Sequence, residues 1–204
     1  DQVVSLLTFV QVTFGVWLTI NLVSYVAKGR YRRHYAVFSR AKPIDWLATT
    51  ASSSVLIVAT VALGITLIVA WPAVLGWSWL MLLARPEEAA NAGQNLNLAP
   101  AQLPYLGLVF VALLAFSVPG FARYEEEQFR RGTNGLGDAL ARSVKFGLAH
   151  CVVGVPLGLG LALTVPGLWL TYQYRRGGIR RAVFVHSIYN WLILAGLAGW
   201  LVVR

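Results

Sequence analysis

The sequence predicts an all-α fold, a polytopic transmembrane helical bundle with about six membrane segments. Only 12% of its 204 residues are charged, about half of the ~25% that is usual in soluble domains. The mean hydropathy is +0.64, and several apolar runs exceed the roughly 18 residues that indicate a membrane span. Such runs must be helical in lipid, because each backbone N–H and C=O group has to be satisfied within its own segment.

The N-terminal part of the chain, residues 1–102, predicts membrane segments joined by a basic loop. Residues 3–27 form a first span, which is too long for the core of a signal peptide. The loop at 28–42 carries six Lys and Arg residues. Residues 46–70 predict a second full span. The shorter tryptophan-rich segment at 71–84 is expected at the membrane interface, because tryptophan favours the headgroup level.

The rest of the chain predicts four further segments in the membrane. A span at 103–121 leads into a charged loop at 122–142. Residues 143–174 are apolar and have basic residues at both ends, so this stretch must enter the membrane and return. Its two limbs of about 16 residues reach only about 24 Å, less than a hydrocarbon core of about 30 Å, which indicates thin or partly reentrant segments. A loop with four Arg at 175–181 precedes a final span at 182–203.

The distribution of charge predicts which loops face the cytoplasm. The loops at 28–42, 122–142 and 175–181 are basic, whereas the loop at 85–102 has one Arg and two Glu. By the positive-inside rule we expect an integral protein of the cell membrane or an internal membrane, with the basic loops on the cytoplasmic side and both termini outside. The net charge of +9 therefore indicates topology, and no nucleic acid is expected as a partner.

Three polar motifs stand out in residues 103–204, because polar and ionisable groups in membrane segments are costly and are therefore functional candidates. The first is RYEEEQFRRG, which holds three of the eight acidic residues of the chain. The second is KFGLAH, with Phe146 four residues before His150, and the third is HSIYN, with His186 four residues before Asn190. Residues four apart share a helix face, so each pair lies on one side of its helix.

Helix geometry places these motifs at a similar depth. His150 is expected about 12 Å, and His186 about 8 Å, from the inner end of its helix, and the glutamates lie at the inner end of the span at 103–121. We therefore expect a carboxylate, two imidazoles and a carboxamide in one cavity just below the inner headgroups. A glutamate beside a histidine can deprotonate water, and a histidine with an asparagine can stabilise the oxyanion formed when water attacks an amide.

In combination, EExxxR, FxxxH and HxxxN resemble the motifs of the CPBP intramembrane proteases, which include the type II CAAX-prenyl endopeptidases and the bacterial Abi proteins. The resemblance covers about residues 103–201. It implies an intramembrane endopeptidase that hydrolyses a peptide bond near the cytoplasmic membrane face through glutamate-activated water. It also implies that His150 completes the water site and that His186 and Asn190 stabilise the oxyanion. The site residues implied by the resemblance are Glu125, Glu126, Arg130, His150, His186 and Asn190.

The acidic motif can be aligned with the family pattern in two frames. In the frame EExxFR, Glu125 is the water-activating base and Glu126 is its partner, held by Arg130. The other frame, EExxxRG, begins at Glu126 and ends at Gly132. The first frame keeps the Phe-Arg pair of the family and the second keeps its Gly. Glu126 belongs to the motif in both frames.

The spacing between the first two motifs departs from the family pattern and leaves a second function open. Only 25 residues separate Glu125 from His150, and about two helical turns are missing from the segment GTNGLGDALARS. The helix that carries the acidic motif is therefore expected to end early. The short spacing favours the alternative of a non-catalytic CPBP-like subunit or assembly factor of a larger membrane protein complex.

The expected mechanism requires no cofactor, although two His and a Glu could hold a divalent metal such as zinc. Cys151 is the single cysteine, so neither an intrachain disulfide nor a cysteine-based zinc site is expected. The expected partners are a peptide or protein substrate in the membrane, the lipid bilayer itself and, in the alternative reading, a larger membrane protein complex.

Overall fold

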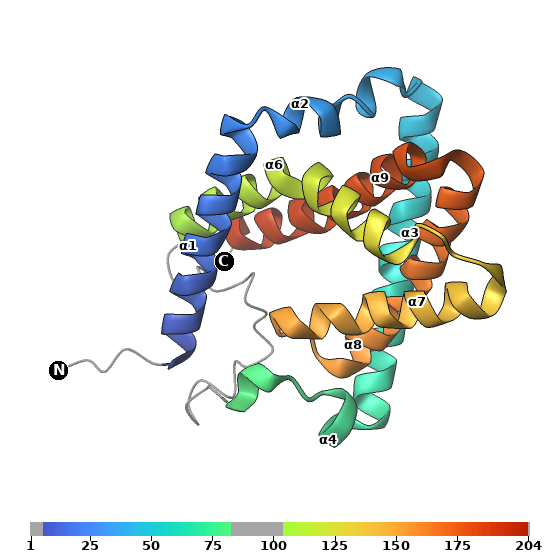
Figure 1. Ribbon diagram of the computed structural model, residues 1–204. Coiled ribbons are helices and arrows are strands. Elements are labelled where there is room, and N and C mark those ends of the chain that lie inside the picture. The colour runs from blue at the N-terminus through green and yellow to red at the C-terminus, as the bar shows by residue number, and fades with distance from the viewer. Residues whose placement is uncertain (1–5, 83–103, 204) are drawn as a thin grey trace.

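The computed structural model describes residues 6–82 and 104–203, and within these ranges every regular element is a helix (Figure 1). The all-α class predicted from the sequence is therefore confirmed. The polar loop expected at 85–102 lies outside the described residues. In chain order, with 3-10 helices written η, the elements are α1 (Leu6–Ala27), α2 (Arg30–Tyr35), η1 (Phe38–Arg40), α3 (Pro43–Ala70), α4 (Pro72–Leu75), η2 (Trp79–Leu82), α6 (Pro104–Phe129), α7 (Gly135–Ala149), η4 (His150–Val153), α8 (Leu157–Ala162) and α9 (Thr164–Val203).

Three helical stretches in the described part of the chain are long and apolar enough to cross a membrane. They are Pro43–Ala70, Gly107–Phe129 and Leu157–Val203, the last of which includes both α8 and α9. Val12–Ala27 forms a shorter apolar helix. The protein is therefore a helical membrane protein. Fewer long helices are found than the six expected segments because Leu157–Val203 joins two of these segments across a bend, and because Val12–Ala27 and α7 are shorter.

Helix α3 is apolar on its outer face and polar on its inner face. Val55 and Val58 are 71% and 69% exposed, whereas Ser53 and Thr60 are buried. A helix of a water-soluble protein shows the reverse pattern. Small and hydroxyl-bearing side chains let membrane helices approach each other closely. The outer face of α3 is thus suited to contact with lipid.

Helix α6 continues past the expected end of its span at residue 121 and carries the three glutamates of the acidic motif before it ends at Phe129. Two ion pairs between residues four apart, Arg123–Glu127 and Glu126–Arg130, support its last turns. The helix ends within the motif, and Gly132, the last residue of the motif, adopts a left-handed conformation with φ 74°. Helix α7 then begins at Gly135, so most of the segment expected as a loop at 122–142 is helical.

The stretch expected to enter and leave the membrane reverses between α7 and α8. Gly154 supplies the turn with φ 90°, a backbone conformation that glycine adopts readily. The tryptophan-rich segment closes this turn: Ser78 Oγ donates a hydrogen bond to the carbonyl of Gly154 at 2.9 Å, and Trp79 Nε1 donates one to the carbonyl of Cys151 at 3.0 Å. Segments more than 70 residues apart therefore satisfy each other's polar groups.

Helix α9 forms the centre of the bundle and is bent at the expected basic loop. Gly177 and Gly178 have non-helical dihedral angles, so the helix turns back there. Its two limbs pack against α3, α6 and α7, and the second limb lies beside α6 (Figure 1). The apolar core joins α7 to both limbs of α9 and consists of Phe146, Leu170, Phe184, Val185 and Ile188.

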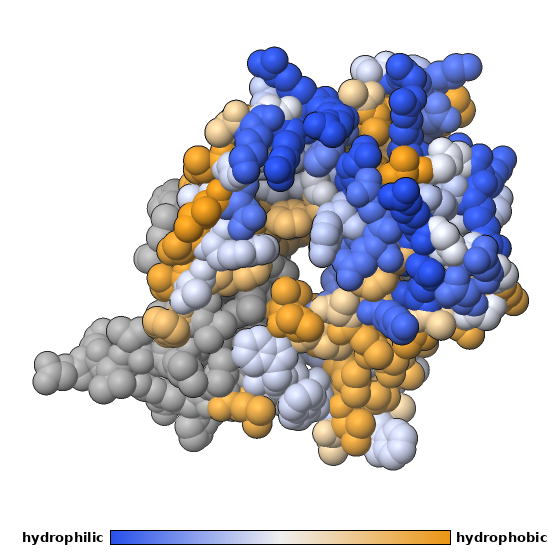
Figure 2. All heavy atoms as spheres, in the orientation of Figure 1, coloured by the Kyte–Doolittle hydropathy of each residue, from blue (hydrophilic) through white to orange (hydrophobic). Residues whose placement is uncertain are grey.

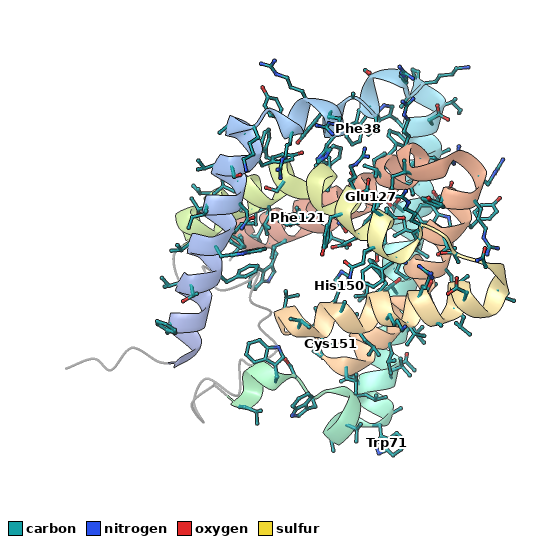
Figure 3. All side chains as sticks on the ribbon, in the orientation of Figure 1. Phe38, Trp71, Phe121, Glu127, His150 and Cys151 are labelled. Atoms are coloured by element: carbon teal, nitrogen blue, oxygen red, sulfur yellow. The ribbon has the colours of Figure 1, made fainter. Side chains whose placement is uncertain are left out.

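The two ends of the molecule differ in polarity. Figure 2 shows hydrophilic side chains gathered toward the end that carries α2, and apolar side chains along α1 and around α4. Figure 3 shows Phe38 near the first end and Trp71 at the opposite one. The acidic motif of α6 lies between these ends, covered by α2 on one side and by α7 on the other (Figure 1).

Candidate functional site

The candidate site is built where α6 packs against the second limb of α9. Glu126 of α6 and His186 of α9 are 60 residues apart in sequence, and both side chains are almost completely buried. Their hydrogen bond joins His186 Nδ1 to Glu126 Oε1 at 2.8 Å. The second ring nitrogen of His186, Nε2, lies 3.4 Å from Glu125 Oε2. One imidazole thus contacts two neighbouring carboxylates.

Arg130 supplies the positive charge of this cluster. It follows Glu126 by one helical turn, is itself fully buried, and has its Nε 3.7 Å from Glu126 Oε2. The guanidinium carbon lies 4.5 Å from the ring centroid of Phe146, a cation–π distance. The pair of Glu126 with Arg130 is the one that the EExxFR frame requires. Glu127, in contrast, pairs with Arg123 at 2.9 Å on a partly exposed face of α6.

Phe146 lies at the centre of the contacts that join the three motifs. Its ring centroid is 4.8 Å from that of His150 and 5.8 Å from that of His186, and both pairs are edge-to-face. Phe146 is part of the FxxxH pattern, but the pattern predicted no role for it. In the structure, its ring separates the two imidazoles and covers the guanidinium of Arg130.

His150 follows the last residue of α7, and Figure 3 shows it in the space between α6 and α7. Its Nδ1 lies 2.8 Å from the backbone carbonyl of Phe146. Because a carbonyl oxygen only accepts hydrogen bonds, Nδ1 must carry the proton. In the neutral ring, Nε2 therefore carries the lone pair and can accept a proton or a hydrogen bond.

Asn190 lies one helical turn after His186 on α9, as the HxxxN spacing requires, and is half-buried. Within the described residues, its side chain makes no hydrogen bond to another member of the predicted site. The structure thus brings four of the predicted site residues into contact, which are Glu125, Glu126, Arg130 and His186. His150 is connected to this cluster through the ring of Phe146. Asn190 lies beside the cluster.

A cavity of about 740 Å³ lies next to the cluster, between α1, α6 and the end of α7. Glu125 and His150 line it, whereas Glu126, Arg130 and His186 lie in the core behind. The space-filling view in Figure 2 shows the molecule hollowed near its middle. Side chains of α1 also line the cavity, among them Trp17, Leu18 and Tyr25. The sequence reasoning missed these residues of α1, because no spacing relates them to the motifs a hundred positions later.

The cluster has unused hydrogen-bonding capacity. Within the described residues, Glu125 Oε2, Glu126 Oε2 and the three guanidinium nitrogens of Arg130 are buried and have no hydrogen-bond partner. Buried polar atoms are nearly always hydrogen-bonded in native proteins. These atoms are therefore suited to bind a small polar molecule such as water.

The charged side chains of the cluster are two carboxylates and one guanidinium. Glu125 and Glu126 supply two negative charges and Arg130 supplies one positive charge. Uncompensated charge is costly in a buried site. The hydrogen bond from His186 Nδ1 to Glu126 Oε1 requires a proton on Nδ1, which the neutral imidazole carries in one of its two tautomers. The geometry thus places a proton where it can be exchanged between a base and its neighbours.

The arrangement does not fit the zinc site considered from the sequence. Zinc needs several ligand atoms converging at about 2.0–2.2 Å from a single point. In the described part of the chain, no group of three or more His, Cys, Asp or Glu side chains is arranged to hold a metal ion. His186 instead directs both ring nitrogens at carboxylates, and His150 directs Nδ1 at a carbonyl.

Among protein-family models, curated proteins and solved structures, nothing matches this chain. The function of the site is therefore argued from its residues and their geometry. The likeness to the CPBP proteases remains the resemblance of three motifs and their order.

Proposed function

We propose that the protein is an intramembrane endopeptidase of the CPBP type, which hydrolyses a peptide bond near the cytoplasmic membrane face through glutamate-activated water. One observation carries the proposal. Glu125 lines a cavity of about 740 Å³, while its carboxylate lies 3.4 Å from an imidazole whose other nitrogen is hydrogen-bonded to Glu126. A partly exposed base is thus supported by a buried, charge-balanced cluster.

The reaction begins when Glu125 accepts a proton from a water molecule and the water oxygen bonds to the amide carbon. The carbonyl oxygen becomes an oxyanion. As this intermediate collapses, Glu125 gives the proton to the amide nitrogen, the C–N bond breaks, and a carboxylic acid and an amine leave. Glu126 and Arg130 take no part in the bond changes and fix the position of the carboxylate.

The proposal gives His186 a role that differs from the one implied by the family resemblance. Both of its ring nitrogens face carboxylates, so it holds Glu125 and Glu126 in place. The proposed donor to the oxyanion is the amide of Asn190, one turn along α9. His150 lines the cavity, and its Nε2 is proposed to accept a hydrogen bond from the attacking water.

The proposal includes the orientation of the protein in the membrane. Arg33 and Arg180 of two basic segments line a second cavity together with Arg123 of α6, so three basic segments lie at one end of the molecule. By the positive-inside rule that end faces the cytoplasm. Glu126 is three residues after Arg123, or about 4.5 Å along the helix axis, which supports a site close to the basic end of the molecule and, in this proposal, near the cytoplasmic face of a bundle of about six membrane segments.

The test uses the three neighbouring glutamates, because they differ in environment and not in chemistry. The purified protein is reconstituted and offered membrane-anchored peptides with and without a prenyl group. We expect Glu125→Gln and Glu126→Gln to lower the cleavage rate by about 10²–10⁴-fold, the usual range for general-base catalysis. Glu127 also lines the cavity but pairs with the partly exposed Arg123 and not with His186 or Arg130. Glu127→Gln therefore removes the same charge and should retain activity. Equal activity of Glu125→Gln and the wild type would refute the proposal.

The alternative function, a non-catalytic subunit or assembly factor of a larger membrane protein complex, is favoured by one observation. Glu126, Arg130 and His186 are fully buried and interact with each other, as polar groups that only tie membrane helices together also do. The same preparation separates the two functions. A subunit would co-purify with a large complex and would cleave none of the peptides.

A further inference from the structure

A second cavity, of about 630 Å³, lies at the polar end of the molecule and takes no part in the proposed hydrolysis. Its walls come from α2, η1, the first turns of α3, α6 and the bend of α9. We call it the arginine cavity. Asp45 is the one acidic residue that lines it within the described part of the chain. Its five arginines are Arg33, Arg40, Arg123, Arg180 and Arg181.

These arginines differ in how far the protein itself satisfies them. Arg123 pairs with Glu127 at 2.9 Å, and Arg181 Nε donates a hydrogen bond to Gln173 Oε1 at 2.6 Å. The other three, which are Arg33, Arg40 and Arg180, have neither a hydrogen bond nor an ion pair to any described residue. The carboxylate of Asp45 already accepts the backbone N–H of Lys42 at 2.9 Å. The positive charge of the cavity is therefore largely uncompensated.

Of the four arginines around the bend of α9, two line the arginine cavity and two do not. Gly178 adopts φ 65°, and a Cβ added to Gly177 would lie 2.7 Å from the side chain of Arg181. The two glycines thus allow Arg180 and Arg181 to line the cavity. Arg175 instead donates a hydrogen bond to the carbonyl of Gly135 at 2.7 Å, and Arg176 donates one to the hydroxyl of Tyr172 at 3.1 Å.

The arginine cavity also has an apolar wall. Val37, Ala41 and Ile179 line it together with Phe184 and Val185, which belong to the buried core. A site for a purely hydrophilic anion needs no such wall. A phosphate group carried by an apolar molecule would satisfy both the guanidinium groups and the apolar side chains.

We propose that the arginine cavity binds a phosphate-bearing anion, supplied either by the headgroup of an anionic phospholipid or by free phosphate. Guanidinium groups bind phosphate oxygens through paired, charge-assisted hydrogen bonds, and several of them can converge on one phosphate. Basic pockets between membrane helices on the cytoplasmic side are suited to anionic headgroups. The proposal does not depend on the peptidase function, because no residue of the Glu125–Glu126–His186 cluster lines this cavity.

The test compares two double variants that remove the same charge from the same two segments. Arg33→Gln/Arg180→Gln removes two cavity arginines that have no protein partner. Arg32→Gln/Arg176→Gln removes two arginines from the same helix and the same bend that contact tyrosine side chains instead. Binding is measured in detergent by the shift in thermal unfolding and by native mass spectrometry. The probes are phosphatidylglycerol, phosphatidylcholine, diacylglycerol and inorganic phosphate.

We expect phosphatidylglycerol to bind the wild type and the Arg32/Arg176 variant with the same affinity. Its affinity for the Arg33/Arg180 variant should be lower by a factor of about ten or more, because two charge-assisted contacts are lost. Saturation by inorganic phosphate would identify free phosphate as the source; binding of phosphatidylglycerol alone would identify a lipid headgroup. Circular dichroism without ligand checks that both variants fold. Equal weakening in both variants, or equal binding of phosphatidylglycerol and diacylglycerol, would overturn the proposal.

Discussion

Two groups of charged residues lie along helix α6 and directly after it. They differ in whether their arginines are paired with acidic residues of the protein. In the first, Arg130 is fully buried, faces Glu126, and lies over the ring of Phe146. In the second, about two turns earlier, Arg123 lines the arginine cavity with four other arginines and one acidic residue. The first group balances its charge within the protein, whereas the second leaves most of its positive charge unpaired.

The difference shows how burial controls what a charged residue can do. A buried charge must be matched by its neighbours, since leaving it alone in a medium of low dielectric constant is very costly. A charge that reaches water can stay unmatched at little cost and remains available to an external anion. The buried cluster is thus suited to hold a proton and a base in place, and the arginine cavity is suited to bind a ligand.

The largest effect is expected from removing the buried positive charge. Arg130→Met leaves Glu126 without its counter-charge and should lower the free energy of unfolding by about 3–5 kcal/mol. The measurement is SDS-induced unfolding in mixed micelles, followed by circular dichroism. The double variant Glu126→Gln/Arg130→Met should recover part of the loss, because neither charge is then buried alone. Additive losses in the double variant would show that the two side chains do not depend on each other.

A smaller effect is expected from the packing that positions Phe146. A Cβ at Gly147 would clash with the carbonyl oxygen of Gly160, where α7 meets α8. Gly147→Ala should therefore cost about 1–3 kcal/mol, the usual range for overpacking, and should disturb the ring that contacts Arg130. Gly137→Ala is the matched control on the same helix, since a Cβ there meets nothing within 4 Å; it should be neutral or slightly stabilising. A Gly147→Ala variant as stable as the control would contradict the close packing of α7 and α8.

Removing exposed arginines should barely change stability. In lipid-free detergent, Arg33→Gln/Arg180→Gln is expected to change the free energy of unfolding by no more than about 0.5 kcal/mol, the usual limit for surface substitutions. Any change should be stabilising, because repulsion among the cavity arginines decreases. The same unfolding assay as for Arg130→Met allows a direct comparison. A loss of several kcal/mol would mean that these arginines have partners within the protein.

The smallest effect concerns His34, which lines the same cavity as Glu125. Burial lowers the pKa of His34, and the positive charges of Arg123 and Arg33 lower it further. The folded protein therefore favours the neutral ring of His34. The stability that the neutral ring contributes is fully present above the ordinary pKa of about 6.5. It is lost as the pH falls through the lowered pKa of the folded protein.

Removing one neighbouring charge tests this interpretation. Arg123→Gln should raise the pKa of His34, since it removes a cation and leaves Glu127 unpaired. The measurement is a titration of labelled histidine by NMR, with His34→Gln identifying the signal among the three histidines. Arg32→Gln serves as the control, because Arg32 contacts Tyr31 instead. An unchanged pKa in the Arg123→Gln variant would show that the charge of Arg123 does not act on His34.

Parts of the site followed from local sequence spacing. The EExxFR frame of the family resemblance gave the Glu126–Arg130 pair, and the spacing of FxxxH put Phe146 and His150 on one helix face, where their rings lie in contact. The end of the motif helix followed from the glycine-rich segment after it. The role of Phe146 could not be predicted in this way, because its ring contacts His186, 40 residues later, through tertiary packing alone.

The sequence by itself determined a helical membrane protein, because long apolar runs in lipid leave the backbone no alternative that satisfies its hydrogen bonds. It also determined the breaks near Gly154 and at Gly177–Gly178, because the conformations found there suit glycine. Only the tertiary structure decided that His186 contacts Glu125 and Glu126, that α1 lines their cavity, and that arginines from three segments meet. These contacts join residues more than 50 positions apart, and at such separations the packing of whole helices, not local periodicity, sets which side chains meet.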